Sequence, residues 1–275
     1  MAYSELLVPV SGGSDDANIL ARAKKLFEIY KIPTTLIYFE PDPKDMMLWP
    51  ADGMASSMSS SLVETLVSTS AEIWAKICKE TEALPEFAIE KIIGAAELLL
   101  EERASLSDLI VVSDVAAAGK STVSSAFEEA LMHGHNPALV LHDRAKFTMD
   151  NIMVAWDGSA QAVRALKAAY YFIEKAKTVT ILQIQENDVA SGNLIHDPHK
   201  LAAWLAKKGT KAKVQIEPCN GKSVGAAIIE AANKANADLL IAGAYGHSRA
   251  REFVFGGVTK NYLKNTSGPH LLISH

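Results

Sequence analysis

The 275-residue chain repeats four sequence landmarks, in the same order, in its two halves. Each half opens with an apolar segment, a short polar turn and a helical pattern, and three further apolar segments follow. The matching segments are residues 5–14 with 151–159, 34–39 with 179–184, 107–113 with 237–243, and 136–141 with 268–273. This order indicates an internal duplication, so both halves should share one fold.

Predicted strands and helices alternate along both halves. After the first strand of each half, apolar side chains recur every three or four residues, which is the spacing of one buried helix face. They are Leu20, Ala23, Leu26, Phe27 and Tyr30, and then Val163, Leu166, Ala169, Tyr170 and Ile173. The strands are nearly continuous apolar runs, as in parallel sheets covered on both faces. We therefore predict an α/β protein of two tandem doubly wound, Rossmann-like domains, each an open sheet of five parallel strands.

A polar stretch at residues 143–150 lies between the two copies of the repeat. We therefore predict a first domain at residues 1–146 and a second at residues 147–275. Within the first domain, the proline-rich residues 41–50 and the serine run 56–61 are predicted loops. A second helix should follow them, from about residue 61 to about residue 80.

The composition favours a globular protein in a reducing compartment. Hydrophobic residues make up 49% of the chain, and the formal net charge of −5 argues against a general nucleic-acid binder. No apolar run approaches the ~18 residues of a membrane span, and the first residues lack the basic start of a signal peptide. Cys78 and Cys219 lack the spacing of a disulfide framework or a zinc site. We therefore expect a cytoplasmic protein with no membrane span and no nucleic-acid partner.

A glycine pattern in the second half carries the most chemical information. Its residues are Gly243, Gly246, Gly256, Gly257, Val258 and Thr259, with nine residues between the second and third glycines. The pattern comes directly after a predicted strand and before a helical pattern. Ligands of open parallel sheets bind beyond the carboxyl ends of the strands, and glycines there let backbone N–H groups approach a phosphate. The pattern therefore predicts a phosphate-binding loop.

This spacing resembles the nucleotide-binding signature of the universal stress proteins, the UspA family, whose fold is similar to that of the adenine nucleotide alpha hydrolases. The resemblance covers the second half well and the first half as a diverged copy. In the family, a serine or threonine follows the last glycine of the signature. Gly257 takes that place here and removes one side-chain contact to phosphate, whereas the backbone contacts need no side chain and Thr259 offers a hydroxyl.

The resemblance also implies an adenine nucleotide site after the first strand of the second half. Asp157 matches a position near the ribose and adenine, and Ala155 and Ile184 match positions that line the adenine pocket. ATP is the implied ligand, with ADP and AMP as alternatives. A Mg²⁺ ion would enter with ATP, since that ion usually keeps phosphate and water ligands.

The first half lacks this signature. Its equivalent stretch, residues 113–116, reads Ser-Asp-Val-Ala, and Ser11 stands where the second half has Asp157. Asp114 would repel phosphates if it faced them. We therefore predict a copy that binds no nucleotide, with a different ligand, or a site completed by a partner, as alternatives. The resemblance further implies that the last strands of the two halves pair across a pseudo-two-fold axis, and a homodimer of the chain is left open.

No pattern marks a catalytic group or a metal site. The Gly-Lys-Ser segments that begin at Gly119 and Gly221 lack the first glycine of a P-loop, and His133 and His135 lack further ligands at zinc spacing. The leading hypothesis is a regulatory ATP-binding stress-response protein whose nucleotide alters its binding to a protein partner. Two alternatives remain open: a slow nucleotide hydrolase or phosphotransferase at the same site, and a scaffold that binds no nucleotide.

Overall fold

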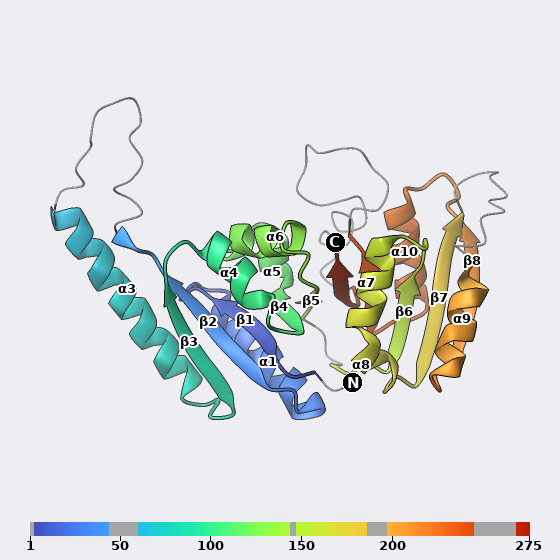
Figure 1. The fold of residues 1–275 in the computed structure, drawn as a ribbon, viewed down its shortest axis with the longest axis horizontal. Helices are drawn as coiled ribbons and strands as arrows, with labels where there is room; N and C mark the ends of the chain where they lie inside the picture. The colour runs from blue at the N-terminus through green and yellow to red at the C-terminus, as the bar shows by residue number, and fades with distance from the viewer. Residues whose placement is uncertain (1–2, 44–59, 144–146, 186–196, 245–267) are drawn as a thin grey trace.

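The computed structural model describes residues 3–43, 60–143, 147–185, 197–244 and 268–275 (Figure 1). The N-terminal half contains strands β1 (Leu6–Val10), β2 (Thr34–Glu40), β3 (Phe87–Ile93), β4 (Leu109–Ser113) and β5 (Ala138–Leu141) and helices α1 (Asp16–Tyr30), α3 (Ser60–Thr81), α4 (Ala96–Ala104), α5 (Asp114–Ala117) and α6 (Ser124–Met132). The C-terminal half contains β6 (Asn151–Ala155), β7 (Thr178–Gln185), β8 (Ala212–Pro218), β9 (Leu239–Gly243) and β10 (His270–Ser274) and α7 (Ala160–Ala168), α8 (Tyr170–Ile173), α9 (Pro198–Lys207) and α10 (Val224–Lys234).

The ten strands form one sheet in the order β3-β2-β1-β4-β5-β10-β9-β6-β7-β8. Within each half every strand pair is parallel, which confirms the predicted fold class. The halves meet where β5 and β10 pair antiparallel, with Leu139 opposite Leu272 and Val140 opposite Leu271. The expected pairing of the last strands is confirmed, and it joins the two five-stranded sheets edge to edge (Figure 1).

Two hydrophobic cores cover the two faces of this sheet. Alternate strand residues pack on one face against α1, α3, α7, α8 and α9, and on the other face against α4, α5, α6 and α10. The central strands β4, β5 and β10 are buried at every residue. Their side chains point alternately to both cores, which explains why these strands read as unbroken apolar runs in the sequence.

The duplication extends to the hydrogen bonds at the start of the sheet. In the N-terminal half the carboxylate of Asp108 accepts hydrogen bonds from the backbone N–H of Ser4 at 2.6 Å and of Glu5 at 3.0 Å. In the C-terminal half Asp238 accepts one from the N–H of Asn151 at 2.9 Å. Each aspartate directly precedes a strand, β4 or β9, and its hydrogen bonds link that position to the start of the first strand of the same half. The matching Ser-Asp and Ala-Asp segments therefore share a structural role.

Several helices begin at side chains that the sequence places for capping. Ser159 caps α7 and Ser223 caps α10, each by accepting a hydrogen bond from the N–H three residues later. α3 runs from Ser60 to Thr81, which agrees with the helix predicted at about residues 61–80. Among the described residues, no helix combines the length and apolar character that crossing a membrane requires.

Aromatic side chains form a second contact between the halves, near the start of the chain. The ring of Tyr3 lies 4.7 Å from that of Tyr171, centroid to centroid, and the Tyr3 hydroxyl donates to the carbonyl of Ala168. The Tyr171 hydroxyl donates to the carbonyl of Tyr30 at 3.1 Å, and burial raises the pKa of Tyr30 to about 12. These contacts add to the β5–β10 pairing in holding the two halves together.

At the opposite end of the junction, two histidines face each other across the halves. Nδ1 of His135 lies 3.1 Å from Nδ1 of His275, so one ring donates and the other accepts. The pKa of His275 is lowered mainly by burial, and further by the nearby charges of His135, Arg164 and His133. Two protonated rings would place two donors and two positive charges face to face, so this contact requires at least one neutral ring.

The thermal stability of the protein should therefore fall as the pH drops through the histidine range. Because the pKa of His275 is lowered in the folded state, the unfolded chain binds more protons than the folded chain below about pH 6.5. The contribution of His275 to folding stability is therefore complete only above that pH, and it is lost as the pH falls. Replacing His135 with asparagine should flatten this dependence, whereas the same change at exposed His199 should leave it unaltered. Thermal unfolding across this pH range tests the point, and equal slopes for wild type and His135→Asn would contradict it.

Candidate functional site

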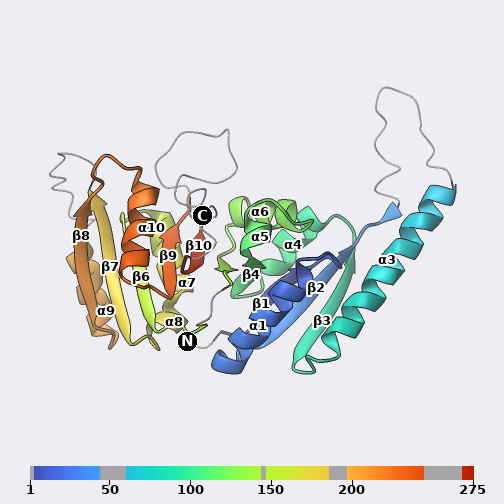
Figure 2. The same ribbon diagram turned by 180° about the vertical axis from the view of Figure 1, so that it is seen from behind.

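The strand order of the C-terminal half creates a switch point between β6 and β9. β6 pairs with β7 on one side and with β9 on the other, and all three strands are parallel (Figure 2). The helix that follows β6 packs on one face of the sheet, whereas α10, which precedes β9, packs on the opposite face. The described connections next to the two strands therefore lie on opposite faces of the sheet, and ligands of doubly wound sheets bind beyond the carboxyl ends of strands at such a point.

Four of the predicted site residues lie at this edge of the sheet. Ala155 ends β6, Ile184 lies near the end of β7, and Gly243 ends β9, while Asp157 follows β6 by two residues. Ala155 is 8% exposed, and Ile184 is half-buried against the core beneath it. The structure thus brings together the residues predicted to line an adenine pocket and those predicted to approach the ribose and phosphates.

The loop after β6 has a defined hydrogen-bonded geometry. Asp157 is exposed, and its Oδ1 accepts a hydrogen bond from the N–H of Ser159 at 2.9 Å. Gly158 adopts a left-handed conformation with φ of 73°, which glycine tolerates best, and Ser159 then caps α7. This turn holds the Asp157 carboxyl group at the carboxyl edge of the sheet, beside the N-terminus of α7.

Gly243 allows a close approach between β9 and α7. A Cβ atom at this position would lie 2.6 Å from the backbone nitrogen of Ala162 and 2.8 Å from Cβ of Gln161. The nitrogen belongs to the first turn of α7 and donates to the Ser159 cap at 3.1 Å. A side chain at residue 243 would therefore push the strand end away from the helix N-terminus, so this first glycine of the predicted loop is required by packing.

The remaining predicted loop residues lie outside the described part of the structure. They are Gly246, Gly256, Gly257, Val258 and Thr259. Their role at the phosphates stays a prediction. It is based on the glycine pattern, of which Gly243 is the first and described residue.

The equivalent edge of the N-terminal half contains carboxylates of the chain itself. Asp16 is 3% exposed, and its Oδ2 accepts hydrogen bonds from the N–H of Ser11 at 2.9 Å and of Gly12 at 2.5 Å. Burial raises the pKa of Asp16, opposed by these bonds from Ser11 and Gly12. The hydroxyl of Ser113 donates to the carboxylate of the adjacent Asp15. The N–H groups of Ser11 and Gly12 and the hydroxyl of Ser113 at the end of β4 therefore already have carboxylate partners within the chain.

The environment of Asp114 differs from the one that the sequence suggested. Asp114 begins α5, directly after Ser113, which caps that short helix. Its Oδ1 lies 2.6 Å from Nη1 of Arg22, and Arg22 also donates to the carbonyl of Leu141 at 2.6 Å. The charge of Asp114 therefore stabilises the N-terminal half through a mostly buried ion pair. No pattern in the sequence singles out Asp16 or Arg22, because a charged residue in an amphipathic helix is usually exposed.

The histidines considered as metal ligands have other contacts. Nδ1 of His133 lies 2.7 Å from Oε1 of Glu129, and His135 faces His275. Within the described ranges, no group of three or more His, Cys, Asp or Glu side chains is arranged to hold a metal ion.

Comparison with known proteins supports the assignment of the C-terminal half. The model of the universal stress protein family matches residues 148–274. Over 130 residues the chain is 30% identical to universal stress protein Slr1230 of Synechocystis sp. (strain ATCC 27184 / PCC 6803 / Kazusa). This match covers 45% of the chain and only 42% of that relative, so it concerns one region of each protein.

Solved structures share the fold over nearly the whole chain. A universal stress protein from Archaeoglobus fulgidus DSM 4304 superimposes with a TM-score of 0.67 and 17% identity, covering 98% of this chain and 94% of that protein. A Pseudomonas aeruginosa UCBPP-PA14 protein provisionally described as a universal stress protein gives 0.56 and 13%, covering 98% and 93%. At such low sequence identity, these structural similarities show the shared two-halved fold alone. The family match at residues 148–274 shows that the C-terminal half of the chain belongs to the universal stress protein family.

Proposed function

We propose that the C-terminal half binds an adenine nucleotide, ATP in the first instance, and that the bound nucleotide regulates the association of this protein with a partner. The observation that carries the proposal is the convergence of Asp157, Ala155 and Gly243 at the switch point between β6 and β9. Both cysteines are free thiols, which suits a reducing compartment such as the cytoplasm.

Each described group has a chemical role in this proposal. The apolar surface of Ala155 and Ile184 would receive the adenine ring, and the Asp157 carboxylate would accept hydrogen bonds from ribose hydroxyls. The close approach at Gly243 brings the end of β9 beside the N-terminus of α7, where free N–H groups and the helix dipole favour phosphate. A Mg²⁺ ion would be held mainly by the phosphates and water.

The N-terminal half binds no nucleotide in this proposal. Asp16 accepts the N–H groups of Ser11 and Gly12, and Asp15 accepts the hydroxyl of Ser113 at the end of β4. An incoming triphosphate would have to displace or neutralise these two carboxylates, and their negative charge repels it.

Replacing Asp157 with alanine should weaken ATP binding about tenfold or more, since a hydrogen bond to a charged group contributes roughly 1.5–3 kcal/mol. The matched control is Ser11→Ala, which alters the equivalent position of the N-terminal half and should leave the affinity unchanged. Calorimetric titration with Mg-ATP measures both. The proposal fails if the wild-type protein binds no adenine nucleotide, and the site is misplaced if Ser11→Ala weakens binding as much as Asp157→Ala.

A further inference from the structure

The charges of the chain are divided unequally between its halves. Residues 1–146 carry 12 lysines and arginines against 22 aspartates and glutamates, a formal net charge of −10. Residues 147–275 carry 15 against 10, a net charge of +5. The overall charge of −5 is therefore the sum of a strongly negative first half and a positive second half. Such a distribution creates fields that act on association between molecules.

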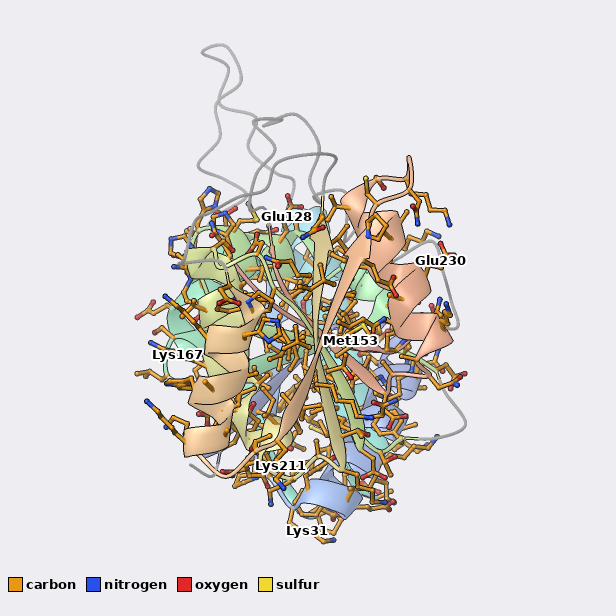
Figure 3. All side chains as sticks on the ribbon, turned by 90° about the vertical axis from the view of Figure 1, so that its right-hand side faces the viewer. Lys31, Glu128, Met153, Lys167, Lys211 and Glu230 are labelled. Carbon is orange, nitrogen blue, oxygen red and sulfur yellow. The ribbon has the colours of Figure 1, made fainter. Side chains whose placement is uncertain are left out.

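Positive charge gathers on α9 and on the turn that follows it, which together we call the basic surface. It consists of the exposed residues Lys200, Trp204 and Lys207 of α9 and Lys208 and Lys211 of the turn, of which Lys211 is labelled in Figure 3. The spacing of the first three places them along one side of the helix, and Nζ of Lys208 lies 5.0 Å from the ring centroid of Trp204. None of these lysines forms an ion pair with another described residue.

Negative charge gathers on two adjoining helices, α4 and α6, which we call the acidic surface. It consists of Glu97, Glu101, Glu102, Glu128 and Glu129. Leu98 lies among them and is 67% exposed. Burial, and then the charge of Glu129, raise the pKa of Glu128, as expected where like charges crowd together. Within the described residues, Glu101, Glu102 and Glu128 form no ion pair.

The two surfaces are too far apart to neutralise each other within one chain. α4 contacts β2 and α9 contacts β7, on opposite faces of the sheet. Seven strand spacings of about 4.8 Å separate β2 from β7, roughly 34 Å in all. That distance is more than three Debye lengths of about 10 Å at 0.1 M salt. Any pairing of these charges must therefore involve another molecule.

We propose that the basic surface of one copy of this chain docks on the acidic surface of a second copy. Apart from Glu129, which contacts His133, the charged side chains of both surfaces form no ion pair with another described residue. Each surface also has one exposed apolar side chain, Trp204 on the basic surface and Leu98 on the acidic surface. The two surfaces are therefore complementary in charge and each adds apolar area to the contact. Because different surfaces meet, the contact is heterologous, and it builds rings or open chains of molecules.

Analytical ultracentrifugation of the full-length protein tests this proposal. Association should weaken roughly tenfold or more when salt rises from about 0.1 M to about 1 M, which shortens the Debye length from about 10 Å to about 3 Å. Lys207→Glu with Lys211→Glu should abolish it, and so should Glu102→Lys with Glu128→Lys. A mixture of these two double variants should associate again, because each then supplies the surface that the other needs.

The matched control is Lys79→Glu with Lys234→Glu, which changes the net charge equally at exposed lysines outside the basic surface and should preserve association. Three results would overturn the proposal: a wild-type monomer in about 0.1 M salt, loss of association in the control variant, or no recovery in the mixture. A monomer that instead binds heparin or anionic vesicles through α9 would assign the basic surface to a different anionic partner. All these outcomes are independent of nucleotide binding.

Discussion

Replacing Arg22 with methionine is expected to lower the free energy of unfolding by about 3–5 kcal/mol, because removal of one partner leaves a buried charge uncompensated. Arg22 is 7% exposed, and its Nη1 donates at 2.6 Å both to Oδ1 of Asp114 and to the carbonyl of Leu141. Methionine fills much of the volume of the arginine but offers no donor. Chemical denaturation followed by circular dichroism measures the change.

Two further variants separate this ion pair from general effects on α1. Lys25→Met, on the same helix but exposed, should change stability by no more than about 0.5 kcal/mol. The double variant Arg22→Met with Asp114→Asn should be more stable than Arg22→Met alone, since the uncompensated charge is gone. A loss below about 1 kcal/mol for Arg22→Met, or no recovery in the double variant, would contradict this explanation.

Replacing Gly243 with alanine should impair both folding and nucleotide binding. The added Cβ would lie 2.6 Å from the nitrogen of Ala162 and 2.9 Å from the carbonyl carbon of Gln161, which are backbone atoms that cannot rotate away. Overpacking of this kind typically costs 1–3 kcal/mol, so about 2 kcal/mol is expected here. ATP affinity should fall roughly tenfold or more, because β9 and α7 must separate at the edge of the sheet where we propose that the nucleotide binds.

Gly209→Ala provides the control for adding a methyl group. No atom lies within 4 Å of the position that its Cβ would take, although the φ of 90° makes any side chain strained there. That variant should lose about 1 kcal/mol of stability and bind ATP like the wild type. If Gly243→Ala binds ATP with unchanged affinity, the close contact between β9 and α7 does not shape the site.

The sequence was sufficient to predict the fold because its apolar pattern reports burial directly. β4, β5 and β10 are buried on both faces, and Leu20, Ala23 and Leu26 lie on the buried face of α1 as their spacing indicates. The joining of the two sheets is different. The antiparallel pairing of Leu139 with Leu272 links residues far apart in the chain, and only the family resemblance indicated it.

The candidate site could be predicted only where a motif marks it. Gly243 follows from the glycine pattern after a strand, Asp157 and Ala155 follow from the family resemblance, and the structure places all three at one edge of the sheet. Asp16 and Arg22 carry no such signal, because each is a buried charge on a helix whose partners come from other segments or from backbone N–H groups. Tertiary contacts set their roles, and local periodicity does not encode those contacts.

The most direct test of the proposed function is the stoichiometry of Mg-ATP binding to the nucleotide-free wild-type chain, measured by isothermal titration calorimetry. The arrangement of Asp157 and Gly243 in one half and of Asp15 and Asp16 in the other predicts one site per chain. Binding at two sites would show that the carboxylates of the N-terminal half do not exclude nucleotide. The absence of any binding to folded protein would contradict the proposal that this chain acts through an adenine nucleotide.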